Sequence, residues 1–121
     1  MSNGNLNTQY KEKSLVVALD SLSKLGDMKL IDYVKLEGTA IENFEVKRNT
    51  EKKNVVVIGG GMSPEWEVSY MSSDNIVRSI IELGHCVTFV DMGADIGVVL
   101  YSLKPEVVYN ALLGTYGEDG C

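Results

Sequence analysis

The sequence predicts an α/β fold with a short parallel sheet. Three short apolar runs, at residues 54–58, 86–90 and 106–112, have the composition of buried parallel strands. Helical patterns lie between them, so strand and helix alternate through the second half of the chain. The expected architecture is a partial Rossmann-like domain of three layers, with right-handed connections between its strands.

The first strand leads into the longest predicted helix. Residues 54–58 are followed by three glycines and then by a helical pattern over residues 64–83. Ser63 is a suitable N-cap, and Pro64 fits the first helical position, where its missing N–H is not needed. Gly84 is expected to end the helix.

The second strand ends at Asp91, and a shorter helix is expected around residues 96–103, before Pro105. The third strand follows over residues 106–112. These elements make up a domain that is expected to span residues 53–121.

Residues 1–52 are expected to form an N-terminal extension or linker that is partly helical or disordered. Charge changes near its end: residues 1–53 hold nine basic and eight acidic side chains, whereas the remainder holds two and nine. Within the extension, residues 14–25 have leucines at near-helical spacing, which predicts a helix ended by Gly26. Residues 28–36 fit either a helix or a strand.

Composition excludes several classes of protein. The net charge of −6 disfavours nucleic acid as a partner, because phosphate binding needs a basic face. No apolar stretch approaches the roughly 20 residues of a membrane span, and the polar N-terminus is no secretory signal. Two cysteines make neither a disulfide framework nor a zinc site. A cytoplasmic protein without a membrane partner is therefore expected.

Sites in open parallel sheets form at the carboxyl ends of the strands. The segment GGGMSPEWEVS at residues 59–69 lies at one such end, but it is no phosphate loop, because Pro64 replaces the third glycine and the lysine is absent. Glu65 and Glu67 in the first helical turn would also repel a phosphate. They either complement the helix dipole, or one of them binds a cation such as a substrate ammonium group.

Other polar residues have structural alternatives. Asp91 occupies the position of a ribose-binding acid, but no dinucleotide fingerprint precedes it. Glu118 and Asp119, in the segment GTYGEDG at residues 114–120, either bind a metal or form a solvated turn. His85 is expected to be a surface or C-capping residue. Cys86 is expected to be a small core residue, and Trp66 a packing residue.

Together, the two glycine-containing segments resemble signatures of the D-alanine–D-alanine ligases. The stretch VVIGGGMSPEWEVSYMS, residues 56–72, is similar to the family's glycine pair followed by Ser-x-Glu-x-Glu-Val-Ser. The stretch KPEVVYNALLGTYGEDG, residues 104–120, is similar to its second signature, Asn-Ala-Leu-His-Gly-x-x-Gly-Glu-Asp-Gly. The resemblance covers about residues 53–121, and residues 1–52 show no such match.

The resemblance implies the first part of an N-terminal, pre-ATP-grasp domain. The family's enzymes are ATP-grasp ligases that join two D-alanines in the cytoplasm, with ATP and magnesium, for peptidoglycan synthesis and hence cell shape. Glu65 corresponds to the catalytic glutamate that holds the ammonium group of the first D-alanine. Ser69 and Glu118 are the other implied substrate-binding residues, which with Glu67 shape the loop. Leu113 stands where the family usually has histidine, so that histidine's role fails here.

The family's ATP-grasp domains follow the region of resemblance. The chain is therefore expected to be a truncated ligase that binds neither cofactor nor metal and is inactive alone; a homodimer is left open. One alternative is a small α/β module that binds an amino acid or a nucleotide. Another is an interaction fragment that docks through residues 1–52.

Overall fold

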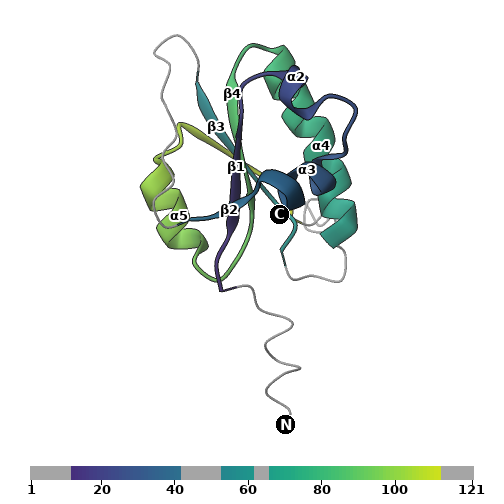
Figure 1. Ribbon diagram of the computed structural model, residues 1–121. Helices are drawn as coiled ribbons and strands as arrows, with labels where there is room; N and C mark the ends of the chain where they lie inside the picture. The colour runs from purple at the N-terminus through teal and green to yellow at the C-terminus, as the bar shows by residue number, and fades with distance from the viewer. Residues whose placement is uncertain (1–11, 42–52, 62–65, 113–121) are drawn as a thin grey trace, which may run out of the picture.

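The computed structural model describes residues 12–41, 53–61 and 66–112. These residues form a five-stranded mixed sheet with helices on both faces, in the strand order β2-β1-β4-β3-β5 (Figure 1). The strands are β1 (Leu15–Leu19), β2 (Thr39–Ala40), β3 (Asn54–Gly59), β4 (Cys86–Asp91) and β5 (Val107–Asn110). The helices are α2 (Leu22–Leu25), α3 (Leu30–Glu37), α4 (Trp66–Glu82) and α5 (Ile96–Leu103).

The alternating β3–α4–β4–α5–β5 unit confirms the predicted α/β fold. β3 pairs in parallel with β4 on one side and with β5 on the other. The helix α4 lies on one face of the sheet together with α2 and α3, and α5 lies on the opposite face (Figure 1). The predicted three layers are therefore present, although β5 is shorter than the expected strand at residues 106–112.

The strand β3, which lies between β4 and β5, is buried along its whole length because both of its faces are covered. Val57 packs with Phe89 and Val77 in the apolar cluster beneath α4. Its neighbour Val56 points the other way, into the cluster beneath α5 that also contains Val99. Successive side chains of a strand point to opposite faces, so the continuous valine run supplies both cores.

The prediction of a helix over residues 14–25 is wrong for its first part. Residues 15–19 form β1, which pairs antiparallel with β4 from Leu15↔Asp91 to Leu19↔Val87. The sheet is consequently mixed rather than purely parallel, and it has five strands where three were expected. The later residues of that segment are helical in α2, and α3 decides the ambiguous segment at residues 28–36 in favour of helix.

Hydrogen bonds hold the segment around β1 to the rest of the sheet. Arg78 of α4 donates to the carbonyl oxygens of Gly26 and Met28, at 3.1 and 2.9 Å. At the other end, Ser14 donates from both its amide and its hydroxyl to Asp95, at 2.8 and 2.9 Å. The described part of residues 1–52 is thus packed into the same body as the ligase-like segments. The expected boundary itself, within residues 42–52, lies outside the described residues.

Across the three described ranges, no helix combines the length and the apolar composition that a membrane crossing requires.

Candidate functional site

The candidate site lies where the strand order reverses. From β3 the chain passes through α4 to β4 on one side, and it then returns through α5 to β5 on the other side. The three strands are parallel, so their carboxyl ends meet at one edge of the sheet, as predicted. Ligands of open α/β sheets bind at such an edge. The residues there are Gly59, Asp91 and Asn110, with the segments that follow them.

The glycine turn, residues 59–61, leaves β3 at this edge with a backbone that only glycine adopts easily. Gly60 and Gly61 have φ angles of 68° and 84°. A Cβ atom on Gly60 would also lie only 2.7 Å from Cγ of Asp91 and 2.9 Å from Cε2 of Tyr70. The turn is therefore closely packed against two side chains as well as conformationally restricted.

Ser69 of α4, one of the predicted substrate-binding residues, holds the glycine turn through a hydrogen bond. Its side chain is buried; its hydroxyl oxygen accepts the amide hydrogen of Gly60 at 3.0 Å. The same hydroxyl donates to the carbonyl oxygen of Ala111 at 2.5 Å. Ser69 thereby joins the loop after β3 to the segment after β5. Its predicted contact with substrate stays a prediction.

Asp91 and Tyr70 form the second support of the glycine turn. Tyr70 donates its hydroxyl hydrogen to Oδ2 of Asp91, and Oδ1 of Asp91 accepts the amide hydrogen of Gly61 at 3.0 Å. Both side chains are buried. Burial, together with the charge and hydrogen bond of Asp91, raises the pKa of Tyr70 far above its usual range, so the phenol stays a proton donor.

Asp91 lies at the predicted edge of the sheet, but the role considered for it was ribose binding, and Tyr70 was not among the predicted site residues. In the structure, the carboxylate of Asp91 accepts hydrogen bonds from the amide of Gly61 and from the hydroxyl of Tyr70. The signal for Asp91 is its position as the last residue of a buried strand. Nothing local marks Tyr70 as its partner, because the pair is 21 residues apart and forms only when α4 packs on the sheet.

Three predicted residues, Glu65, Leu113 and Glu118, lie outside the described residues. In the sequence, Glu65 directly precedes Trp66, the first residue of α4, and Gly61 ends the described part of the glycine turn. Residues 62–65 therefore connect two structurally fixed points at the candidate site. Asp119 is likewise undescribed.

The remaining candidates have the following positions. Glu67 is exposed in the first turn of α4. Trp66 meets Tyr70 edge-on at a centroid distance of 6.2 Å, which fits the expected packing role. Cys86 is partly buried at the start of β4. His85 follows the end of α4, and its amide donates to the carbonyl oxygen of Ile80 at 3.2 Å, which fits the expected C-capping position. Its side chain is partly buried, and among the described residues its Nδ1 atom has no hydrogen-bond partner.

The described residues at this edge hold and orient the glycine turn. Within residues 12–41, 53–61 and 66–112, no three His, Cys, Asp or Glu side chains gather in a way that suits a metal ion.

Comparison with known proteins identifies relatives. The chain is 54% identical over 83 residues to a D-alanine–D-alanine ligase of Rickettsia felis, with 67% of this chain and 26% of the relative covered. It is 52% identical over 89 residues to the enzyme of the same name from Rickettsia typhi, with 72% and 28% covered. No protein-family model and no solved structure matches the chain.

The matched region is longer than the sequence motifs indicated. A match to 72% of 121 residues takes in about 87 residues, whereas only 69 positions lie between 53 and 121. Similarity therefore extends at least about 18 residues before position 53, and the expectation that residues 1–52 lack a match is wrong. The physical reason is visible in the fold, since β1 and α3 belong to the same packed body.

The chain spans only about a quarter of the length of these relatives. Within that span, about half of the matched residues are identical, and both predicted family signatures adjoin the edge where the three parallel strands end. The chain is thus a homologue of the D-alanine–D-alanine ligases, related to about a quarter of their sequence.

Proposed function

We propose that the chain acts as the N-terminal part of an ATP-dependent D-alanine–D-alanine ligase and contributes the site for the first D-alanine. The observation that carries the proposal is the identity of about one half with ligases from Rickettsia, across the segment that contains the glycine turn. The corresponding role is a cytoplasmic step of peptidoglycan precursor synthesis, which serves cell wall formation and cell shape.

Glu65 is the proposed ligand of the substrate ammonium group. It lies between the glycine turn and the first residue of α4, where a carboxylate is compatible with the positive end of the helix. A carboxylate at this position attracts an amine and repels a phosphate. An amino-acid substrate therefore suits this loop better than a nucleotide does.

The buried residues around the turn are proposed to position this loop. Ser69 fixes the amide of Gly60, and Asp91 fixes the amide of Gly61, so the chain enters residues 62–65 in a defined direction. A ligand held by a loop needs such support from side chains that are themselves fixed. Ser69 contributes to the substrate site in this way, and Glu118 is proposed to contribute from the segment that follows β5.

ATP and magnesium are proposed to be bound by the part of a ligase that this chain does not span. Transfer of phosphate from ATP is the chemistry that they supply in the family. The chain alone is accordingly proposed to form no dipeptide. Release of ADP and formation of D-alanyl-D-alanine by the purified 121-residue chain, in a coupled assay, contradicts this part of the proposal.

The binding role is tested by calorimetry with D-alanine and with propionate, which lacks the ammonium group. D-alanine should bind the wild-type chain more tightly than propionate, and Glu65→Gln should remove this difference. Glu82→Gln, at the exposed far end of α4, is the matched control and should preserve it. If Glu65→Gln leaves the preference for D-alanine intact, Glu65 does not hold the ammonium group.

A further inference from the structure

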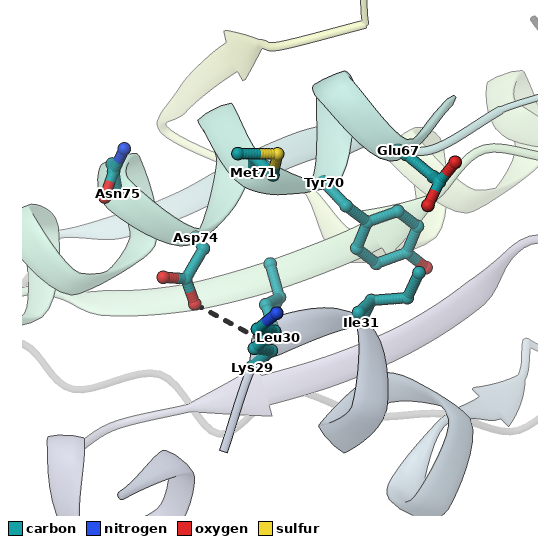
Figure 2. A pocket seen from close by; sticks show the side chains of 8 residues that line it. All are labelled: Lys29, Leu30, Ile31, Glu67, Tyr70, Met71, Asp74 and Asn75. Atoms are coloured by element: carbon teal, nitrogen blue, oxygen red, sulfur yellow. Dashed lines mark hydrogen bonds between the residues drawn. The ribbon is translucent and has the colours of Figure 1, made fainter. Parts of the chain in front are cut away.

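A pocket of about 340 Å³ lies between α3 and α4, on the face of the sheet that these helices cover (Figure 2). Leu30 lines it from α3, and Tyr70 and Met71 line it from α4. Asp74 also lines it, but its Oδ1 atom accepts the amide hydrogen of Leu30 at 3.3 Å, and its Oδ2 atom accepts a hydrogen bond from Arg78. The carboxylate therefore joins the two helices.

The edge strand β5, by contrast, is poorly covered. On the face of the pocket, α3 packs on β1, and α4 packs on β3 and β4. Every residue of β5 is exposed: Val107, Val108 and Tyr109 are 39%, 45% and 51% accessible to solvent. The adjacent strand β3 has a similar valine-rich sequence and is buried throughout. β5 thus has the composition of an interior strand in an exposed position.

The outer edge of β5 has none of the usual protection against further pairing. Among the described strands, β5 pairs with β3 alone. Proteins protect such edges by making the strand very short, or by placing a lysine, a proline or a bulge in it. The opposite edge is protected in the first way, because β2 has only two residues. β5 consists of VVYN in an unbroken register, so its edge can accept another strand.

The direction of the backbone groups identifies the residue at the centre of this edge. The amide of Ala111, directly after β5, donates to the carbonyl oxygen of Ile58 in β3 at 2.8 Å. Successive residues of a strand direct their amide and carbonyl groups to opposite sides, so Tyr109 and Val107 face β3 in the same way. Val108, between them, directs its backbone groups to the free edge.

The side chains of β5 lie on both faces of the sheet. Val107 and Tyr109 lie on the α4 face, because their register partners in β3 belong to the cluster beneath α4. Val108 lies on the α5 face, because its partner Val56 belongs to the cluster beneath α5. A strand that pairs with β5 therefore gains apolar contacts on both faces.

We propose that β5 is an interface for a second copy of this chain, in which the two β5 strands pair antiparallel about a two-fold axis at Val108. Each Val108 then lies opposite Val108 of the second copy, and their outward backbone groups exchange hydrogen bonds. On the α4 face, Val107 of each copy lies opposite Tyr109 of the other. Pairs of a β-branched and an aromatic side chain stabilise antiparallel strands.

Charge and symmetry favour a second copy over an unrelated strand. The VVYN segment has no charged side chain, and Glu106, which precedes it, falls opposite the uncharged Asn110 of the second copy. No like charges therefore face each other across the paired strands, although the whole chain has a net charge of −6. A two-fold axis uses the same surface in both copies, so one exposed strand suffices. Because β5 has only four residues, the dimer is weak and reversible.

The test is sedimentation velocity of the 121-residue chain at a series of concentrations up to about 1 mM. The wild type should change reversibly from monomer to dimer as its concentration rises. Val108→Lys should weaken association at least about tenfold, because two like charges then lie directly opposite each other. The matched control is Val98→Lys, which adds the same charge at a side chain of α5 that is 66% exposed, and it should associate as the wild type does.

A mixture of two charged variants tests the register itself. Val108→Glu alone should associate as poorly as Val108→Lys, whereas an equimolar mixture of the two should form heterodimers, because opposite charges then meet at the axis. Association in the mixture also shows that both variants are folded. The proposal is overturned if the wild type stays monomeric, if Val108→Lys associates as the wild type does, or if the mixture does not associate. Growth beyond the dimer also contradicts it, because pairing at β5 uses the free edge and closes the assembly.

Discussion

Tyr70 and Asp91 form a buried hydrogen-bonded pair that connects α4 to the carboxyl end of β4. The second oxygen of the carboxylate receives the amide of Gly61, so the pair also fixes the loop that leaves β3. Helix, strand and loop are therefore held through one carboxylate. Tyr70 packs in addition against Phe89, with the ring centroids 5.3 Å apart.

Replacing Tyr70 with phenylalanine should lower the free energy of unfolding by about 1–3 kcal/mol, because Asp91 loses a buried hydrogen-bond donor while the ring packing is retained. Tyr101→Phe is the control, since Tyr101 is 79% exposed and should change stability by less than about 0.5 kcal/mol. Urea unfolding of the three proteins measures both effects. Equal stabilities for the two variants would show that the Tyr70–Asp91 bond contributes nothing net.

Stability should also depend on pH through Tyr70. Its pKa is raised in the folded protein above the value of 10.0 that applies to the exposed side chain. Below pH 10 both states hold the phenolic proton, so the contribution of Tyr70 is fully present. Above pH 10 the unfolded chain releases the proton while the folded protein retains it, so stability falls as pH rises.

This dependence is measured by urea unfolding at a series of pH values around 10. The free energy of unfolding should fall more steeply above pH 10 for the wild type than for Tyr70→Phe, which lacks the ionising group. Parallel curves for the two proteins would contradict a raised pKa at Tyr70.

Gly60→Ala should destabilise the protein through two separable effects. Its φ of 68° costs an alanine about 1–2 kcal/mol, and the new Cβ atom meets Asp91 and Tyr70 as well. Gly84→Ala has the conformational cost alone, because φ is 94° and no atom lies within 4 Å of its added Cβ. Gly97→Ala, in α5 with open space around it, should instead stabilise by about 0.5–1 kcal/mol. Thermal unfolding gives the order, and a Gly60 variant no less stable than the Gly84 variant would exclude the steric effect.

Leu30→Ala tests whether the segment before β3 belongs to the core. Leu30 is 1% exposed and packs within the cluster beneath α4, so its truncation should cost about 2–5 kcal/mol. Leu36, on the same helix, is 67% exposed, so Leu36→Ala should cost less than about 0.5 kcal/mol. Similar unfolding midpoints for both variants would mean that α3 is only loosely attached.

The sequence was sufficient to predict the β3–α4–β4–α5–β5 unit because each strand is a short valine-rich run bounded by glycine, proline or aspartate. It was insufficient for β1. Leu15, Leu19 and Leu22 have a spacing that suits a helix, and a short apolar run cannot be assigned by period alone. The two adjacent β-branched residues Val16 and Val17 were the available signal for a strand.

The candidate site was predictable at the level of the sheet edge and of the glycine turn. Asp91 ends a buried strand, so its position followed from the strand pattern. The contacts of Ser69 did not follow, because its hydroxyl bonds to Gly60 and also to Ala111, which lies 42 residues after Ser69 in the sequence. These contacts depend on how α4 packs on the sheet. The pocket between α3 and α4 could not be predicted either, because the residues that line it are far apart in the sequence.

The antiparallel place of β1 has a consequence for biosynthesis. Its main partner is β4, and the contact between Ser14 and Asp95 joins residues 81 positions apart. A ribosome therefore releases the LVVAL segment long before its partner strand β4 exists, and of the described strands only the two-residue β2 can pair with it in the interval. Closing so long a loop is slow compared with forming the local β3–α4–β4 unit. Of the described strands, the earliest in the chain is consequently one that docks late, and until then its apolar side chains are exposed to chaperones and to aggregation.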